Sequence, residues 1–325
     1  MRFNFILIIL MVNSAIVCFS QTENSFPTDT SFATYSTYQK EVKNYPFITI
    51  AQSITDETVI RYKDVEYARY GDRIMHIDLY LPSPAPEEKR PAVLLIHGGG
   101  WRSGNKSMEA PMASFLASKG FICAAVEYRL STEALYPAAV IDLKTAIRWL
   151  RRNTERYYID TTRIAALGCS SGGQLAALLG ATNGTTLFSN ELYPGYSSNL
   201  QAVIDIDGIL AFIHPESGEG IDKPGKPSSA TLWIGATKEE DPNLWRESSP
   251  LTHAGKTFPP VLFLNSQYPR FHAGRDDLIA RLDSLNRYSE VHEIKNTPHP
   301  FWLFNPWFDS TANWCLQFLN KQFNP

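Results

Sequence analysis

The chain has 325 residues, of which 44% are hydrophobic, so it can bury one large core or two modest ones. Its 30 basic and 33 acidic residues give a net charge of −3 and form no basic stripe, which argues against a nucleic-acid partner. Seven histidines lie outside any paired metal-ligand spacing, so we expect no metal site. Cys123, Cys169 and Cys315 are an odd number in apolar surroundings and predict buried thiols instead of a disulfide framework.

Residues 1–20 predict a secretory signal peptide. Arg2 is their only charge, an apolar run follows it, and small residues precede the expected cleavage position. A transmembrane anchor would need about 20 apolar residues, and Asn13 and Ser14 interrupt this run. A lipoprotein signal at Cys18 is the remaining alternative. We therefore expect a secreted or periplasmic protein that is not stably inserted in a membrane.

The mature chain begins with a polar lead over 21–45, rich in Ser and Thr, which is either loosely ordered or lies along the body. Alternating residues on both sides of Gly71 and Asp72 then predict a β-hairpin over 65–82. From there on, apolar strands alternate with amphipathic helices. We expect strands at 92–98, 121–128, 163–168, 201–208, 260–264 and 289–294, and helices at 138–153, 172–181, 275–286 and 310–322.

This alternation predicts an α/β fold in which helices cover both faces of a mostly parallel sheet. The leading hairpin supplies an antiparallel edge. Residues 209–258 break the rhythm with Gly, Pro, Ser and charged residues. We expect them to form a small insertion over the carboxyl edge of the sheet, where ligands bind in such folds. The chain shows no internal repeat, so we expect one domain over 46–325.

Ser170 is the candidate nucleophile. It is the centre of a G-x-S-x-G motif, Gly168-Cys169-Ser170-Ser171-Gly172, between an expected strand and an expected helix. In that context the motif forms a sharp turn that lifts the serine hydroxyl above the sheet, at a helix N-terminus. Small flanking residues are needed because neighbouring backbone crowds the turn. A phosphate-binding loop is the alternative, but no lysine follows as a P-loop requires.

The stretch 94–104, LLIHGGGWRSG, supplies candidate oxyanion donors at the end of an earlier strand. Glycines let backbone N–H groups approach a developing oxyanion, and removing one such donor typically costs about 3–4 kcal/mol in the transition state. We assign the oxyanion hole to Gly99, Gly100 and the N–H of Ser171, with Trp101 as a further candidate donor.

These motifs resemble the esterase branch of the α/β-hydrolase fold. Within that branch the chain is most similar to secreted bacterial carbohydrate esterases related to the hormone-sensitive-lipase group, from about residue 60 to the C-terminus. The resemblance is carried by HGGGW at 97–101, by 127–153, by 160–179 and by TPHPFWLF at 297–304. It implies a Ser–His–acid hydrolase without a cofactor. The usual S-A-G-G is S-S-G-G here, which is a mild departure.

His299 is the candidate general base. It follows the last expected strand, between Pro298 and Pro300, and it comes after Ser170 in the chain order of this fold. It would accept the Ser170 proton and return it to the leaving alcohol.

The carboxylate that orients His299 is missing from its usual place. In the family resembled, it follows a late strand, about where this chain has Pro269. Loss of the acid can cost about 10⁴ in turnover, so we expect a substitute. Asp207 is our first choice because it ends a strand that already points at the ligand edge. Asp276 or Asp277 is the second choice, although a helix start already accounts for such acids. A Ser–His dyad or another acid is the third.

A basic cluster of Arg270, His272 and Arg275 is expected at the same edge of the sheet. Arginine can hold a carboxylate by two parallel hydrogen bonds, and a uronic-acid polymer such as pectin carries carboxylates next to its esters. Trp101 and Trp302 are candidate platforms for sugar faces. Further candidates for stacking on sugar faces are Phe301, Phe304, Trp307 and Phe308. The alternative is that the aromatic residues belong to the core and the arginines are solvated or paired.

The leading hypothesis is a secreted serine esterase that removes acetyl or methyl groups from plant cell-wall polysaccharide such as pectin. A xylan acetyl or feruloyl esterase is the close alternative, and another hydrolase activity on the same fold is more distant. A non-catalytic carbohydrate-binding protein on a hydrolase scaffold is the competitor from another class. The complete serine motif, the glycines and His299 count against it. The polysaccharide and the oligomeric state stay open at this point.

Overall fold

A computed structural model describes residues 29–190 and 192–323 of the chain. The expected signal peptide, with Cys18, lies outside these residues. Within the described ranges, every helix is too short or too polar to span a bilayer.

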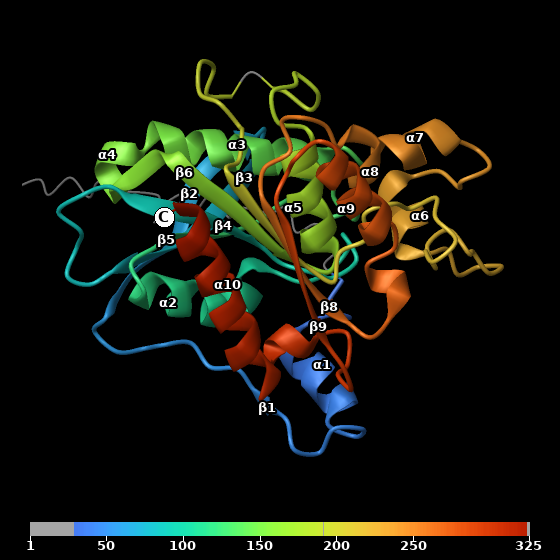
Figure 1. Cartoon of the computed structure of the whole chain (residues 1–325), viewed down its shortest axis with the longest axis horizontal. Helices are drawn as coiled ribbons and strands as arrows, with labels where there is room; N and C mark the ends of the chain where they lie inside the picture. Colours follow the sequence, from blue (N-terminus) through green and yellow to red (C-terminus); the bar gives the residue numbers. More distant parts are fainter. Residues whose placement is uncertain (1–28, 191, 324–325) are drawn as a thin grey trace, which may run out of the picture.

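An eight-stranded sheet forms the centre of the fold (Figure 1). Its strands are β2 (Val59–Tyr70), β3 (Arg73–Pro82), β4 (Arg90–Ile96), β5 (Ile122–Val126), β6 (Ile159–Cys169), β7 (Ala202–Ile206), β8 (Val261–Ser266) and β9 (Ser289–Ile294). They lie in the order β2-β3-β5-β4-β6-β7-β8-β9. The pairs β2–β3 and β3–β5 are antiparallel and all others are parallel. This topology confirms the expected α/β fold with an antiparallel hairpin at one edge.

Helices cover both faces of the sheet (Figure 1). The main ones are α2 (Ala110–Ser118), α3 (Ala138–Arg152), α5 (Ser171–Ala181), α9 (Arg275–Ser284) and α10 (Trp307–Phe323). Along β4, Ala92, Leu94 and Ile96 pack with α3 and α5, whereas Val93 and Leu95 pack with α2 and α10. Successive side chains of a strand point to opposite faces, so one strand contributes to both cores.

The described part of the N-terminal lead lies along the body. Helix α1 (Thr34–Glu41) is followed by β1 (Thr49–Ile50), which pairs antiparallel with β10 (Phe304–Asn305). The ring of Tyr38 lies 6.2 Å from the ring of Phe304. At the start of the segment, Asp29 accepts a hydrogen bond from Arg102 Nε at 2.8 Å. The described residues of 21–45 therefore lie along the body, which is the second of the two arrangements expected.

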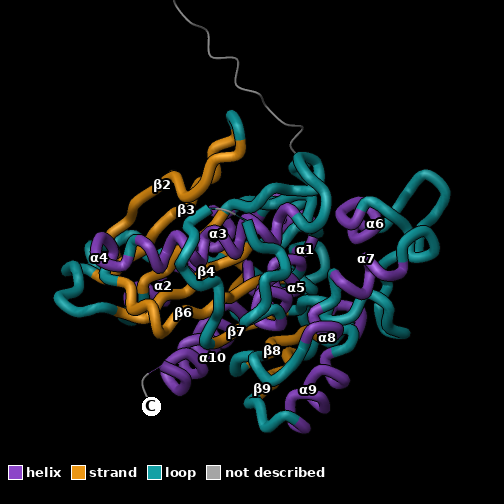
Figure 2. Tube along the Cα trace, turned by 90° about the horizontal axis from the view of Figure 1, so that it is seen from above, coloured by secondary structure: helices purple, strands orange, loops and turns teal. Residues whose placement is uncertain are grey.

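The expected insertion over 209–258 folds into three short helices, α6 (Ser229–Ile234), α7 (Pro242–Glu247) and α8 (Pro250–His253). Ser228 and Asp241 cap the first two by accepting backbone N–H groups. In Figure 2, α6 and α7 lie at the end of the molecule away from the β2–β3 hairpin. Glu219 and Ser229 of the insertion border the pocket above Ser170, so the insertion lies where it was expected.

Cys123, Cys169 and Cys315 are free and buried in the described chain, as expected.

Helix α2 was not expected. Its apolar residues lie on most sides of the helix and leave no clear apolar stripe for a sequence pattern to detect; they are Ala110, Met112, Ala113, Phe115, Leu116 and Ala117.

Candidate active site

Ser170 occupies a strained turn between β6 and α5. Its φ of 54° and ψ of −118° are a conformation that L-residues rarely adopt, at a cost of about 1–3 kcal/mol. Its N–H donates to the carbonyl of Ile206 at 2.7 Å. A Cβ on Gly168 would lie 1.9 Å from the Gly172 oxygen, and one on Gly172 would lie 2.1 Å from the Ile96 oxygen. Only glycine fits on either side of this serine.

His299 connects Ser170 to a carboxylate. Its Nε2 lies 2.9 Å from the Ser170 Oγ, and its Nδ1 lies 2.8 Å from Oδ2 of Asp207. The other oxygen of Asp207 accepts the N–H of Ser266 at 2.7 Å, and the residue is 1% exposed. An imidazole held in this way has its acceptor nitrogen facing the hydroxyl, which is the arrangement that activates a serine nucleophile.

The end of β7 presents Asp207 to the histidine. Asp207 has a φ of 52°, and its N–H donates to the Leu264 carbonyl at 3.0 Å. Two residues earlier, the buried Asp205 accepts the N–H of Gly208 at 2.8 Å and so closes the turn. Burial, with a further contribution from the Asp207 charge, raises the pKa of Asp205 well above its usual range. Asp205 therefore holds the turn, and Asp207 is the residue of the turn that reaches His299.

The other acids considered for this role lie elsewhere. The carboxylate of Asp276 accepts a hydrogen bond from Arg275 Nε at 2.8 Å, and its side chain is 81% exposed. The carboxylate of Asp277 lies 3.4 Å from Nε2 of His214. Both are in the first turn of α9, as the helix-start argument allowed. Asp207 is the carboxylate that the structure brings to His299.

An aromatic residue lies in the loop where the family resembled usually carries the acid. The short 3₁₀ helix η2 (Pro269–Phe271) follows β8, and the Phe271 ring stacks on the His299 imidazole with centroids 3.4 Å apart and planes at 9°. Trp302 meets the same imidazole edge-on, at 5.2 Å and 86°. Two rings therefore restrict the orientation of the imidazole. The sequence carries no signal for this role of Phe271, because it depends on the path of the loop.

The glycine loop after β4 borders the same hydroxyl. Gly99 has a φ of +128° and Gly100 a φ of +60°, and a Cβ on Gly99 would lie 2.1 Å from the Ser103 oxygen. The Ser103 hydroxyl donates to the Gly99 carbonyl at 3.0 Å. Both glycines line one pocket with Ser170 and Ser171. The residues expected to form the oxyanion hole are thus brought together.

His97 holds the start of this loop. Its Nδ1 donates to the Gly98 carbonyl at 2.8 Å, and its ring stacks on Tyr128 at 4.5 Å and 18°. Burial lowers the pKa of His97 to about 4, so the ring is neutral at physiological pH. The loop is therefore fixed without adding a charge beside the nucleophile.

The pocket above Ser170 has a volume of about 280 Å³. Three parts of the chain that the motifs did not indicate contribute to its wall. These are Ser31 and Phe32 from the N-terminal segment, Glu219 and Ser229 from the insertion, and Phe271 from the loop after β8. Neither the polar lead nor the insertion has a spacing that would have marked these residues. Across residues 29–190 and 192–323, no three His, Cys, Asp or Glu side chains are grouped to hold a metal ion.

The interpretation of Trp101 as an exposed platform for sugars is wrong. The residue borders the pocket, but it is only 3% exposed. Its ring stacks on Trp233 at 4.9 Å and 12°, and its Nε1 donates to the Gln174 side chain at 2.8 Å. The physical reason is the positive φ of 58°, which turns the side chain away from the loop surface and against the insertion. The indole joins the loop to the insertion.

We expect Trp101→Ala to lower the free energy of unfolding by about 3–5 kcal/mol, the usual cost of removing a large buried aromatic side chain. Urea unfolding would measure this change. The matched variant Trp101→Phe keeps an aromatic ring and loses the hydrogen bond to Gln174, so it should cost about 1–2 kcal/mol. A Trp101→Ala protein of unchanged stability that acts poorly only on polysaccharide would restore the stacking role.

The interpretation of Trp302 as a sugar platform is also wrong, because the residue is 4% exposed and packs between the core and His299. The aromatic residues around it follow the core alternative. Phe301, Phe304 and Phe308 are buried, and Trp307 packs edge-on against Tyr45 at 5.4 Å.

The basic cluster is divided by the fold. Arg275 is 9% exposed and donates to Asn265 and Glu293, both at 3.0 Å, so it is a structural residue. His272 is half-buried and does not line the pocket, and burial lowers its pKa. Arg270 lines the pocket, with a side chain that is 54% exposed and lies 3.7 Å from the Glu219 carboxylate. Of the three, Arg270 alone stays a candidate for substrate contact.

Comparison with known proteins assigns the family. The family model described as BD-FAE matches residues 77–278, more than half of the chain. The chain belongs to the BD-FAE family. The matched region contains Gly99, Gly100, Ser170 and Asp207, and it ends before His299.

Several curated relatives of this BD-FAE chain are named as esterases. Esterase LipC of Mycobacterium tuberculosis is 28% identical over 67% of this chain and 53% of its own length. Carboxylesterase NlhH of the same organism is 31% identical over 42% of this chain and 48% of its own length. The chain spans about half the length of the curated relatives it matches.

Solved structures similar to this BD-FAE chain confirm the α/β-hydrolase fold. A truncated carbohydrate esterase from gut microbiota has a TM-score of 0.68 at 22% identity, covering 84% of this chain and 100% of that one. A bifunctional GH43-CE protein of Bacteroides eggerthii has a TM-score of 0.69 at 24% identity, over 81% of this chain and 38% of that one. Esterase 2 of Thermogutta terrifontis has a TM-score of 0.66 at 21% identity, over 79% and 93%.

Proposed function

We propose that this protein is a secreted serine esterase that removes acetyl or methyl groups from a plant cell-wall polysaccharide such as pectin. The observation that carries the proposal is the chain of hydrogen bonds from Ser170 through His299 to Asp207, beside the glycine loop. Secretion rests on the predicted signal peptide at 1–20.

The geometry supports acyl transfer in two halves. The Ser170 oxygen forms a bond to the ester carbonyl carbon as its proton passes to Nε2 of His299. Donors at Gly99, Gly100 and Ser171 would receive the oxyanion, and the ester C–O bond then breaks as His299 protonates the leaving alcohol. Water repeats these steps in reverse order, releasing the acid and free Ser170.

The size of the pocket supports a short acyl group. Its volume of about 280 Å³ is just below the 300–1,000 Å³ range of typical small-molecule sites. This volume accommodates an acetyl group together with part of a sugar ring. The similarity to proteins named carbohydrate esterase supports a carbohydrate substrate.

Arg270 supports an acidic sugar next to the ester. Its guanidinium lies over the Phe271 ring, 4.5 Å from the ring centroid. The same ring stacks on the His299 imidazole. Glu219 occupies one side of the guanidinium at 3.7 Å. More than half of the side chain is exposed, so its remaining N–H groups can bind a carboxylate at the pocket rim.

We expect Arg270→Ala to lower kcat/KM on a methyl-esterified or acetylated uronic-acid polymer by about tenfold, equivalent to about 1.4 kcal/mol. On a small aryl acetate the same variant should lose less than about twofold, because that substrate has no carboxylate to bind. Arg246→Ala, at an arginine of α7 outside the pocket lining, is the matched control and should leave both substrates unaffected. Equal losses on the two substrates would assign Arg270 a structural role.

Release of small products tests the proposed function. The purified protein would be incubated with acetylated and methylated pectin and with acetylated xylan, and acetate and methanol would be quantified. We expect release from pectin that is absent in the Ser170→Ala variant. Preferential release of acetate from xylan would favour the xylan esterase, and binding to polysaccharide with no product release would favour the non-catalytic alternative.

A further inference from the structure

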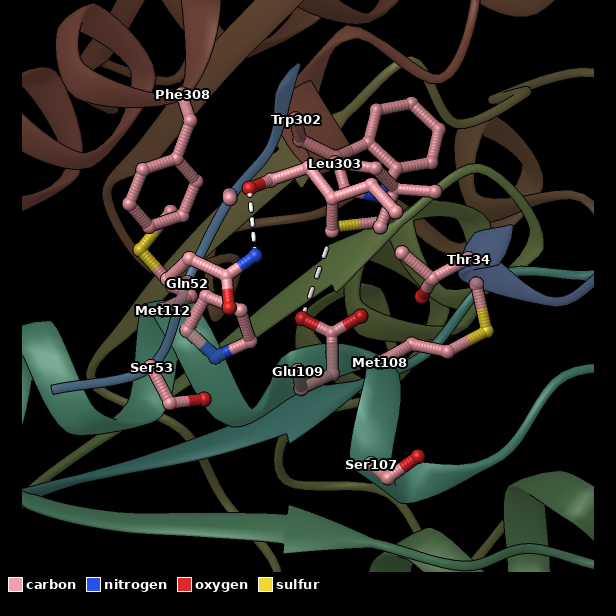
Figure 3. A pocket seen from close by; sticks show the side chains of 14 residues that line it. Thr34, Gln52, Ser53, Ser107, Met108, Glu109, Met112, Trp302, Leu303 and Phe308 are labelled. Atoms are coloured by element: carbon pink, nitrogen blue, oxygen red, sulfur yellow. Dashed lines mark hydrogen bonds between the residues drawn. The ribbon is translucent and has the colours of Figure 1, made fainter. Parts of the chain in front are cut away.

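A second cavity, which we call the Glu109 pocket, lies beside α2 and α10 on the sheet face opposite α3 and α5 (Figure 3). Its volume is about 180 Å³. Gln52 and Ser107 are exposed and form its mouth. Met108 and Met112 line its walls together with Leu303. The lining therefore combines polar and apolar side chains, and one lining residue, Trp302, also contacts His299 of the site described above.

Two buried polar side chains lie deep in the Glu109 pocket. Glu109 is 2% exposed, and one carboxyl oxygen accepts the Sγ–H of Cys169 at 3.9 Å. Its other oxygen, Oε1, has no hydrogen-bond partner. Trp302 is 4% exposed, and its Nε1 also has no partner. Figure 3 shows Glu109 and Trp302 on facing sides of the cavity. Buried polar groups are nearly always paired, so two unpaired groups that border one cavity make it a candidate site for a hydrogen-bonding partner.

The chemistry of both groups is that of a hydrogen-bond donor. Burial raises the pKa of Glu109 to about 8, so its carboxyl group is neutral at pH 7. With Oε2 accepting from Cys169, Oε1 is the oxygen of the neutral carboxyl group that can carry the proton and donate. The indole nitrogen of Trp302 can only donate. The Glu109 pocket therefore has two hydrogen-bond donors, the Glu109 carboxyl group and the Trp302 indole N–H, which would bind a hydrogen-bond acceptor.

The surroundings of Glu109 add no charge. The titratable groups that face it are Cys169 of β6, Cys315 of α10 and Tyr128 beyond β5, and burial raises the pKa of all three. All three stay neutral at the pH at which Glu109 ionises. Lysine, arginine and histidine are absent from the lining residues of this described cavity.

We propose that the Glu109 pocket binds a small uncharged molecule that has a carbonyl or hydroxyl oxygen at its tip and a short apolar body. The donors select the oxygen, the methionine and leucine side chains select the apolar body, and the lack of charge in the lining disfavours ions. Short-chain alcohols and short-chain amides share this chemistry. Binding here does not require ester turnover at Ser170.

A ligand in the Glu109 pocket would lie next to residues that adjoin the candidate catalytic residues. Cys169 directly precedes Ser170, and Trp302 contacts the imidazole of His299 edge-on. A ligand that hydrogen-bonds to Trp302 would therefore also help to hold the ring that packs on His299.

Saturation-transfer NMR with 1-butanol and with butyramide, titrated into the full-length protein, tests the proposal. We expect at least one probe to bind at pH 6.5, and the probe that binds identifies a hydroxyl or a carbonyl tip. Trp302→Phe keeps a ring against His299 and removes only the donor, so its affinity should fall about fivefold to tenfold. Trp314→Phe, on α10 outside the lining, is the matched control and should bind normally.

The pH dependence provides a second readout. Affinity of the unmodified protein should fall as the pH rises through about 8, because ionised Glu109 loses its donor. Glu109→Gln keeps an N–H donor and cannot ionise, so its affinity should be independent of pH between 6.5 and 9, a window we choose to bracket the pKa of Glu109 at about 8. The proposal is overturned if neither probe binds, or if binding is unchanged in both Trp302→Phe and Glu109→Gln at every pH.

Discussion

Ser170→Ala is expected to lower ester turnover by at least about 10⁴-fold while the protein stays folded, because the variant loses the hydroxyl oxygen that lies 2.9 Å from Nε2 of His299. Hydrolysis of a chromogenic acetate ester measures the loss, and thermal unfolding checks the fold. The alanine also keeps the tight turn, since its side chain is smaller than that of serine.

His299→Ala should cost a similar factor, and the double variant should lose little more than either single one, because nucleophile and base act as a unit. Losses that multiply in the double variant would show that the two residues act independently. A Ser170→Ala protein with more than a few per cent of the original activity would remove Ser170 from the reaction.

Asp207→Asn is expected to lower turnover by about 10³–10⁴-fold with little change in stability. The Ser266 N–H needs an acceptor, so the asparagine would turn its oxygen to Ser266 and its NH₂ group to Nδ1 of His299. Nδ1 would then accept, and the proton would reside on Nε2, which could no longer accept from Ser170. Initial rates on a chromogenic acetate ester, followed across pH, measure the effect.

Asp276→Asn is the matched control for this carboxylate. Asp276 is largely exposed and bonded to Arg275, so the variant should retain nearly full activity. If Asp276→Asn were as inactive as Asp207→Asn, or if Asp207→Asn kept wild-type turnover, then Asp207 would not orient the base.

Local patterns were enough to locate the parts of the site that lie at element boundaries. Ser170 and Gly99 follow directly from glycine motifs at the ends of expected strands, because such turns tolerate little else. Asp207 required an argument about topology. Parallel strands end at one edge of the sheet, so the carboxylate of β7 can replace one that usually follows β8.

Side-chain direction in loops was beyond the reach of the sequence. Trp101 was a candidate platform for sugars because it lies near the oxyanion loop, yet it has a positive φ and its indole is buried. Phe271 stacks on His299 only because η2 brings it there. Phe32 reaches the pocket from about 140 residues before Ser170 in the sequence, and only tertiary packing determines such a contact.

The most direct test of the account is the site of covalent labelling by a fluorophosphonate. The probe forms a bond from phosphorus to an activated serine oxygen as fluoride leaves, and peptide mass spectrometry identifies the labelled residue. We predict one label per chain, on Ser170, with loss of esterase activity in proportion to labelling. The His299→Ala variant should not be labelled, because its serine is not activated. Labelling of another residue together with the loss of activity, or full activity in a protein labelled at Ser170, would contradict the account.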